Sequence, residues 1–374
     1  MNVPKLRFKK FTMEWEYKIF DDLITNKSNI YNIQKDSNNY KCIELENIKP
    51  NLGMLNGYFN SVDQKSSKNY FFKNEILFGK LRPYLKKYWF AKFDGVCSTE
   101  FWVLKSKDTQ KITNKFLYYI IQSNYFLQLC NLSTGSKMPR ADWSYIKEQS
   151  IAIPILSEQE KIANTLELLD KKIELQLKKI EALKLYKKGL INLVKSDWKS
   201  WKNYKIKDIF KITRGVVIPK NKLSEEKNEI YKYPVYSSQT SNNGILGYDK
   251  IYDYNGKYLT WTTDGANAGK VFYRDGKFRC TNVCGILYED NPLFTNEFVC
   301  DLLNYETPKH VSYVGNPKLM NNVMENINLK LPNNDILIKT SKLISLINKK
   351  VENETNKLMK LHNLKKGLIQ NMFV

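Results

Sequence analysis

The feature that most constrains the fold of this chain is a long, charged, helix-forming segment that occurs twice. The first copy reads PILSEQEKIANTLELLDKKIELQLKKIEALKLYKKGLINL and covers residues 154–193. The second reads PNNDILIKTSKLISLINKKVENETNKLMKLHNLKKGLIQN and covers residues 332–371. Shifted by 178 residues, the two copies align without a gap, and both contain KKGLI near their ends.

Each copy has apolar residues at the spacing of a coiled coil. Polar residues interrupt the two stripes at corresponding places, at Gln176 and Glu354 and again at Lys187 and Lys365. Shared interruptions favour a shared partner, so we predict that the two helices pack on each other. The alternative is two unrelated amphipathic helices that each lie on their own domain. The predicted packing residues are Ile162, Leu166, Leu169, Ile173, Ile180, Leu183, Leu190, Ile344, Ile347, Val351, Leu358, Leu361 and Leu368.

Shorter matches upstream extend the duplication over the whole chain. TNKFL at 113–117 matches TNEFV at 295–299, and CSTEFWVL at 97–104 matches CTNVCGIL at 280–287. Each half therefore has a strand-rich region with Gly, Asp and Asn turns, a short helix capped by Thr113 or Thr295, a polar glycine loop and the long helix.

We predict an α+β fold, a pseudo-twofold tandem repeat in which two long helices form an antiparallel coiled coil and separate two mixed α/β domains. A helix of this length measures about 55 Å, which exceeds one turn of DNA of about 34–36 Å. The predicted boundaries are 1–151 and 197–329 for the two domains, and 152–196 and 330–374 for the two helices.

The charge balance indicates a polyanionic partner. The chain has 60 Lys and Arg against 38 Asp and Glu, a net charge of +22. AT-rich coding can also enrich Lys and Asn, but a surplus of this size in a folded protein favours nucleic acid. The sequence has neither a signal-peptide core nor a run near the ~18 apolar residues of a membrane span. We therefore predict a cytoplasmic protein.

Residue patterns for catalysis or metal binding are weak. Cys280 and Cys284 lack a second cysteine pair and are better explained as parts of a buried strand than as zinc ligands. GANAGK at 265–270 is one residue short of phosphate-loop spacing and is followed by Val271, which favours a turn between strands. An adenine methyltransferase would need an Asn/Asp-Pro-Pro-aromatic segment to hold the flipped base. The candidate segments of this sequence have only a single Pro. We predict no catalytic residues and no metal site in this chain.

Several segments resemble one known family. LSEQEKIANTLELLDKKIELQLKKIEALKLYKKGLI resembles the first conserved region of type I restriction-modification specificity (S) subunits, and GKLRPYLKKYWFAKFDGVCSTEFWVL is similar to a core of their target recognition domains. YPVYSSQTSNNGILGYDK and DGANAGKVFYRDGKFRCTNVCGIL resemble another version of that domain. The second helix departs from the pattern, because NNDILIKTS stands where LSEQEKIAN is expected, and a weaker partner contact is expected there.

The resemblance implies a non-catalytic subunit that reads double-stranded DNA. Each recognition domain of the family reads one half of a bipartite sequence, and the helices set the spacer. Two N6-adenine methyltransferase subunits bind the S subunit, with or without two ATP-dependent restriction subunits. The resemblance places S-adenosylmethionine, ATP and Mg²⁺ on those partners and no cofactor on this chain. The two domains differ in sequence, so we expect an asymmetric site.

Basic and amide residues in strands and loops are the candidate DNA contacts. Among the neighbouring aromatics, Tyr84 and Trp89 are better explained as core residues, and Arg82 has a buried ion pair as its alternative. The candidate DNA-binding residues are Lys80, Arg82, Lys86, Lys87, Ser136, Lys137, Arg140, Arg214, Ser238, Gln239, Thr262, Thr263, Asn267, Asn316 and Lys318.

Two other functions fit parts of the sequence. The chain could serve a related system in which one partner carries both methyltransferase and nuclease. A basic coiled-coil scaffold for RNA or DNA is the other alternative, and it predicts equal affinity for the two nucleic acids.

Overall fold

The computed structural model describes residues 3–32, 34–36, 38–132, 138–290 and 292–374. Its contacts divide the chain into two compact units. Unit 1 consists of residues 1–177 and 356–374, and unit 2 consists of residues 178–355. Each long helix therefore contributes one part to each unit. Within the described residues, the structure contains no helix that is long and apolar enough to cross a membrane.

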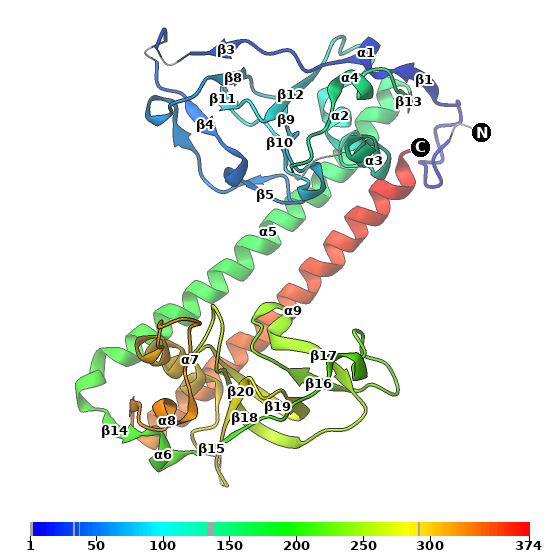
Figure 1. Cartoon of the computed structure of the whole chain (residues 1–374). Helices are drawn as coiled ribbons and strands as arrows, with labels where there is room; N and C mark the ends of the chain where they lie inside the picture. Colours follow the sequence, from blue (N-terminus) through cyan, green and yellow to red (C-terminus); the bar gives the residue numbers. More distant parts are fainter. Residues whose placement is uncertain (1–2, 33, 37, 133–137, 291) are drawn as a thin grey trace. The chain divides into compact units, whose positions relative to one another are not determined.

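The strand-rich region of unit 1 forms one sheet in the order β10–β9–β12–β2 and another in the order β3–β8–β11–β4–β7 (Figure 1). Two short pairs, β1 with β13 and β5 with β6, lie outside these sheets. The strands are β1 (Glu16–Ile19), β2 (Ile24–Thr25), β3 (Ile30–Tyr31), β4 (Lys41–Ile43), β5 (Ile48–Lys49), β6 (Met54–Leu55), β7 (Phe59–Asn60), β8 (Lys68–Phe71), β9 (Ile76–Gly79), β10 (Tyr88–Phe90), β11 (Gly95–Ser98), β12 (Phe101–Ser106) and β13 (Ser150–Ile153).

Helices cover the first of these sheets and form the main core of unit 1. Phe116 on one short helix and Phe126 on the next are buried in the same cluster as Ile162, Leu166 and Ile369 of the long helices. Strand β9 is apolar and buried throughout because both of its faces are covered, with Ile76 and Phe78 in one core cluster and Leu77 in another. The helices are α1 (Phe20–Leu23), α2 (Asn114–Ile120), α3 (Asn124–Leu132), α4 (Trp143–Ile146), the first part of α5 (Leu156–Val194) and the last part of α9 (Asn334–Met372).

Unit 2 has a sheet in the order β15–β20–β18–β19–β16–β17 and a separate β14–β21 pair. Trp261 is completely buried against this sheet, because Gly285 on the adjacent strand leaves room for its ring. The elements are β14 (Lys202–Lys205), α6 (Ile206–Ile209), β15 (Lys211–Arg214), β16 (Tyr233–Tyr236), β17 (Ile245–Asp249), β18 (Tyr254–Thr262), β19 (Val271–Cys280), β20 (Cys284–Tyr288), α7 (Glu297–Glu306), α8 (Asn321–Met324) and β21 (Asn328–Leu331).

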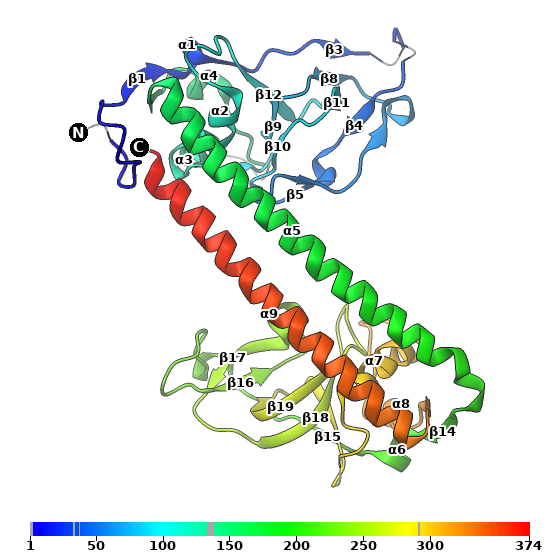
Figure 2. The same cartoon turned by 180° about the vertical axis from the view of Figure 1, so that it is seen from behind.

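The two long helices run antiparallel in both units. In unit 1 the start of α5 packs with the end of α9, and in unit 2 the end of α5 packs in the same core cluster as the start of α9 (Figure 2). The predicted α+β architecture, with two recognition regions and two long helices, is confirmed. Among the predicted packing residues, the buried ones are Ile162, Leu166, Leu169, Ile173, Ile180, Ile344 and Ile347, and the half-buried ones are Leu183, Leu190, Val351, Leu358, Leu361 and Leu368.

Two local predictions were wrong. Thr113 does cap α2, since its hydroxyl accepts the N–H of Phe116 at 3.2 Å, but Thr295 does not cap α7. Asn296 has the extended backbone of an N-cap and accepts the N–H of Val299 at 2.9 Å. The hydroxyl of Thr295 instead donates to the Glu289 carboxylate at 2.8 Å.

The segment LRPYL is a 3-10 turn, Pro83–Leu85, and not a strand. Pro83 suits the first position of such a turn because its φ is fixed and it has no N–H to satisfy. Arg82 and Lys86 flank the turn with left-handed backbone conformations, each with a φ of 51°. The turn leaves Tyr84 54% exposed, which contradicts its prediction as a core residue, whereas Trp89 is buried as predicted.

Candidate nucleic-acid interface

Unit 1 contains a polar hollow with a volume of about 620 Å³. It lies where the segment after β2 passes beside β8, β9 and β12. Its wall combines lysines, amides and hydroxyls with aromatic rings, a mixture suited to phosphates and bases. The lining residues are Asn26, Lys27, Ser28, Asn29, Ile30, Asn69, Tyr70, Phe72, Lys80, Thr99, Phe101, Trp102 and Lys105.

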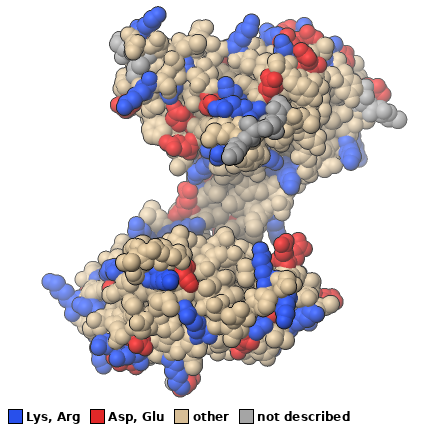
Figure 3. Space-filling view, viewed as in Figure 1, with Lys and Arg blue, Asp and Glu red and all other residues tan. Residues whose placement is uncertain are grey.

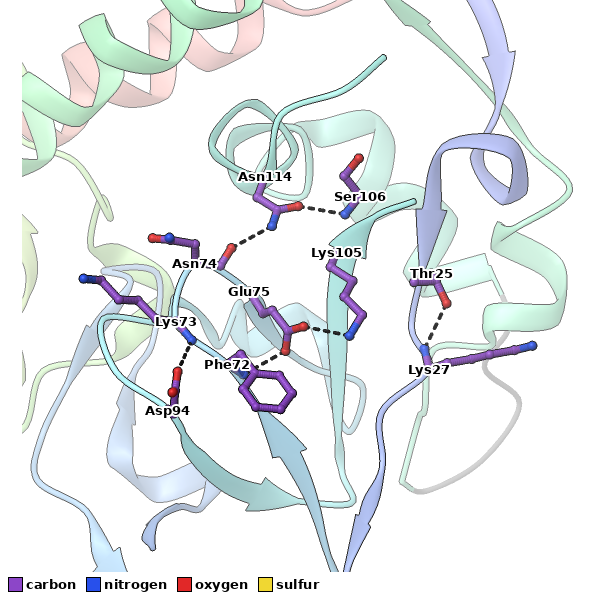
Figure 4. Close-up of polar contacts among 10 residues, drawn as sticks. All are labelled: Thr25, Lys27, Phe72, Lys73, Asn74, Glu75, Asp94, Lys105, Ser106 and Asn114. Atoms are coloured by element: carbon purple, nitrogen blue, oxygen red, sulfur yellow. Dashed lines mark hydrogen bonds and ion pairs between the residues drawn. The ribbon is translucent and has the colours of Figure 1, made fainter. Parts of the chain in front are cut away.

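The lysines of this hollow are not equivalent. The ammonium of Lys105 lies 2.7 Å from Oε1 of the buried Glu75, whose Oε2 accepts the N–H of Phe72 at 2.9 Å (Figure 4). The side chain of Lys27 points away from this pair in Figure 4. Among the described residues, Lys27 and Lys80 have no carboxylate within 4 Å. The hollow therefore offers two cations for an incoming anion.

Three of the predicted DNA residues are brought to one edge of the hollow from separate segments. The carbonyl of Lys80 accepts the N–H of Ala141 at 2.9 Å, and the N–H of Arg82 donates to Pro139 at 2.7 Å. These bonds place Arg140 beside Lys80 and Arg82. The structure shows no ion pair for the exposed Arg82 among the described residues, so the buried-pair alternative is wrong.

Arg140 has a partner within this edge. Its guanidinium donates to both carboxylate oxygens of Glu100, at 3.1 and 3.0 Å, and this hydrogen bonding lowers the pKa of Glu100. The pair is solvent-exposed, so its charges remain within reach of a ligand. Glu100 is thus a structural carboxylate that orients Arg140. The predicted residues Ser136 and Lys137 lie outside the described residues.

Lys86 and Lys87 do not line this hollow. Lys86 lines a smaller depression of about 170 Å³ together with residues of α9, among them His362 and Lys366. The ammonium of Lys87 donates to the carbonyl of Leu45 at 2.6 Å. Lys86 and Lys87 therefore lie apart from Lys80 and Arg82, because the turn Pro83–Leu85 redirects the chain.

The predicted residues of unit 2 gather in three neighbouring loops. Gly265 donates to Pro317 at 3.0 Å, and Leu319 donates to Thr263 at 2.8 Å, so loop 263–270 lies against loop 311–320. The exposed Asn316 and Lys318 belong to the latter loop, and the guanidinium of Arg214 lies 3.9 Å from Sδ of Met320.

The third loop, residues 237–244, joins β16 to β17. Asn267 donates its amide to the hydroxyl of Thr240 at 3.1 Å and so connects this loop to loop 263–270. Ser238 and Gln239 are half-buried here, and the amide of Gln239 is bonded to the carbonyl of Ile245.

Thr262 and Thr263 must be removed from the predicted DNA contacts. Their exposed fractions are 1% and 0%, and their hydroxyls bond to the carbonyls of Asn267 and Val283. In a regular strand, neighbouring side chains point to opposite faces, so only one of the two threonines would be buried. Strand β18 ends at Thr262, so this alternation does not extend to Thr263, and both side chains lie beneath the loops. These threonines support the loops instead of facing a ligand.

On the face drawn in Figure 3, acidic and basic side chains are intermixed. Figure 3 shows Lys and Arg side chains on the visible faces of both units, with Asp and Glu among them. Among the described residues, no group of three or more His, Cys, Asp or Glu side chains is placed to hold a metal ion.

The model of the type I restriction modification DNA specificity domain matches residues 13–185 and again residues 199–366. The chain belongs to this family. It carries two specificity domains in tandem, and each match includes one recognition region and most of the following long helix.

Similar proteins from Mycoplasma pneumoniae support this assignment. A candidate type I specificity subunit is 36% identical over 208 residues, which cover 54% of this chain and 84% of the relative. The specificity subunit of the type I restriction enzyme MpnII is 41% identical over 133 residues, covering 35% of this chain and 39% of the relative. The chain therefore spans well under half of that second relative.

Solved structures show the same fold over the whole length. The S subunit of a type I restriction-modification system from M. genitalium has a TM-score of 0.67 and 19% identity, and the match covers 100% of this chain and 99% of that chain. A chain from a study of type I complex assembly has a TM-score of 0.51 and 15% identity, with 95% and 96% covered.

Sequence reasoning missed several residues of this specificity subunit's candidate interface. Lys27, Asn29 and Asn69 line the hollow of unit 1 but lie in short, irregular segments that gave no periodic signal. The polar cluster NKSN at 26–29 was the available clue, because such a run beside a short strand indicates an exposed loop. Its position opposite β8 depends on the non-local pairing of β3 with β8.

Proposed function

We propose that this chain is the DNA-reading subunit of a type I restriction-modification complex and that it has no catalytic activity of its own. Each unit binds one half of a bipartite DNA sequence. The two half-sites differ, because unit 1 presents a hollow between two sheets and unit 2 presents a cluster of loops on one continuous sheet. The observation that carries the proposal is the hollow with Lys27 and Lys80, which have no carboxylate partner in the described part of the chain.

The chemistry resides on partner subunits. Two N6-adenine methyltransferase subunits use S-adenosylmethionine, and two ATP-dependent restriction subunits, where present, cleave with Mg²⁺. Exposed leucines on α5 support a protein partner, since Leu168, Leu175 and Leu185 are 61%, 65% and 71% exposed.

Affinity purification from the native host tests the proposal. The tagged chain should recover a stoichiometric N6-adenine methyltransferase, and methylation mapping of the host DNA should give a bipartite motif with unlike halves. A partner that combines methyltransferase and nuclease in one chain would assign it to the related fused system. Recovery of RNA or ribosomal proteins without a methyltransferase would contradict the proposal.

The role of the hollow can be tested on the same complex. Lys27→Ala and Lys80→Ala should weaken DNA binding for all sequences and reduce the slope of log affinity against log salt by about 1 each. Lys172→Ala is the matched control, because Lys172 is an exposed lysine on α5 away from the hollow. Equal effects of all three substitutions would show that the hollow does not contact DNA.

A further inference from the structure

Unit 2 contains a buried arginine whose charge is not paired with a carboxylate. Arg274 on β19 is 3% exposed, and among the described residues no carboxylate lies within 4 Å of it. Its Nε donates to the hydroxyl of Thr260 at 3.1 Å, and its guanidinium carbon lies 3.5 Å from the centre of the Tyr236 ring. Burial of an unpaired charge is costly, so its remaining contact is informative.

That remaining contact fixes the loop between β16 and β17. Nη1 of Arg274 donates to the carbonyl of Asn243 at 2.9 Å. Asn242, Asn243 and Gly244 have successive positive φ angles of 46°, 51° and 81°. Glycine and asparagine are the residues that adopt this left-handed conformation most readily. The arginine is therefore bonded to the left-handed part of the loop.

Glycine is required at the third of these positions. A Cβ at residue 244 would lie 3.0 Å from Nη2 of Arg274, in addition to the strain of its positive φ. Ser237 closes the loop by donating to the carbonyl of Gly244 at 3.0 Å. Asn267 holds the other side of the loop through Thr240. The backbone of this loop is thus fixed before any ligand arrives.

The loop presents two free amides to solvent. Asn242 and Asn243 are exposed, and their side chains have no hydrogen-bond partner among the described residues. The other amides nearby differ, since Gln239 is bonded to Ile245 and Asn267 is bonded to Thr240. An asparagine amide matches the N6 donor and N7 acceptor of adenine in the major groove.

We propose that Asn242 and Asn243 read adenine bases in one half of the DNA site and that Arg274 is the positioning residue that holds them in register. This inference rests on the proposed function of the chain as a DNA-reading subunit. The sequence suggested Ser238 and Gln239 as the DNA contacts of this loop, and the structure assigns the base contacts to Asn242 and Asn243 at the tip of the loop instead. Arg274 itself is too deeply buried to contact DNA.

Methylation motifs of the complete complex provide the test. The chain is co-expressed with its methyltransferase partner, and the motif is read by sequencing that detects N6-methyladenine. Asn242→Ala and Asn243→Ala should each relax the preference at a position of one half-site by roughly tenfold, while the other half-site, read by unit 1, stays unchanged. Asn255→Ala is the control, because Asn255 is an exposed asparagine on β18 outside these loops.

Arg274→Lys tests the positioning role. Lysine keeps the charge but cannot bond to Thr260 and Asn243 together, so this variant should relax the same positions as Asn243→Ala. If it does not accumulate as a folded protein, the two asparagine variants still decide the inference. An unchanged motif in both asparagine variants, or relaxation in the half-site read by unit 1, overturns it. A parent complex that methylates no motif would instead overturn the proposed function, and this inference with it.

Discussion

The first turns of α5 and α9 are attached to their units by opposite chemistry. At the start of α5, Glu158 is fully buried, and both of its carboxylate oxygens accept 2.8 Å hydrogen bonds from Arg7. Gln159 is also fully buried and donates to the carbonyls of Lys111 and Pro154. The corresponding residues of α9 are Ile336 and Leu337, and Leu337 belongs to the apolar core of unit 2.

This difference explains the motif that varies between the two helices. The segment LSEQEKIAN is anchored inside unit 1 by Glu158 and Gln159, so these two side chains are not available to a partner protein. The weaker partner contact expected from NNDILIKTS therefore does not follow from the loss of Glu158 and Gln159. The apolar start of α9 is anchored by Leu337, at the position of Gln159, whereas Ile336, at the position of Glu158, is 38% exposed.

A second difference concerns the lysines that interrupt the helix stripes. In unit 1, Lys365 lies 2.6 Å from Asp170 of α5, which also accepts a 2.9 Å hydrogen bond from Tyr119. In unit 2, Lys187 lies 2.7 Å from Asp301, which belongs to α7 and occupies the position that corresponds to Tyr119. The carboxylate that pairs with the lysine lies on a long helix in unit 1 and in the recognition region in unit 2. Lys365 therefore joins α9 to α5, whereas Lys187 joins α5 to α7.

Arg7→Met should have the largest effect. It leaves the carboxylate of Glu158, whose side chain is 1% exposed, without its partner, and such a loss costs about 3–5 kcal/mol in the free energy of unfolding. Urea unfolding followed by hydrogen exchange in unit 1 measures it. Lys18→Met, which removes an exposed pair with Glu16, is the control and should have little effect, because water screens exposed pairs. Equal losses would contradict the anchoring role.

Asp170→Asn should have the next largest effect, lowering the free energy of unfolding by about 2 kcal/mol. This is less than the cost of about 3–5 kcal/mol for a fully buried pair, because the Lys365–Asp170 pair is less deeply buried. Lys365 keeps its charge, and its side chain is 9% exposed. Hydrogen exchange should locate the loss in unit 1. Asp301→Asn should instead act on unit 2, where the side chain of Lys187 is 19% exposed. A change of protection in the same unit for both variants would contradict this comparison.

Asp301→Asn should change how the free energy of unfolding depends on pH. Burial raises the pKa of Asp301 above its usual value despite the nearby Lys187. A carboxyl whose folded-state pKa is raised contributes stability below its unfolded-state pKa, and this contribution is lost as the pH rises through the folded-state pKa. Asp301→Asn should therefore gain stability relative to the parent over that range, with a slope of at most about 1.4 kcal/mol per pH unit. A difference in urea midpoint that stays constant from pH 3 to 7 would contradict the prediction.

The double variant Arg7→Met, Glu158→Ile should have the smallest effect. It gives position 158 the residue type that α9 has at Ile336, and replacement of both members of a buried ion pair by apolar residues is often neutral. We expect a free energy of unfolding within about 1 kcal/mol of the parent, measured as for Arg7→Met alone. A loss as large as that of the single variant would show that unit 1 cannot accept the apolar solution.

Some features of this chain are local and could be predicted from its sequence. Helix periodicity depends on neighbours three and four residues apart, so the repeat of residues 154–193 and 332–371 was enough to predict both long helices and much of their buried face. The cap at Thr113 and the turn at 265–270 are also short-range features. The prediction at Thr295 was wrong by one residue, because two adjacent residues, Thr295 and Asn296, could both serve as a cap.

Other features arise only when distant segments meet. The sequence alone showed a duplication, a basic charge and two helix starts of different composition. Which lysine has a carboxylate beside it, which threonine is buried and which asparagine is free depend on contacts between residues tens to hundreds of positions apart, as with Arg7 and Glu158 or Arg274 and Asn243. Charge and polarity are properties of a residue, whereas availability to a ligand is a property of its packed surroundings, and those are decided by the tertiary structure.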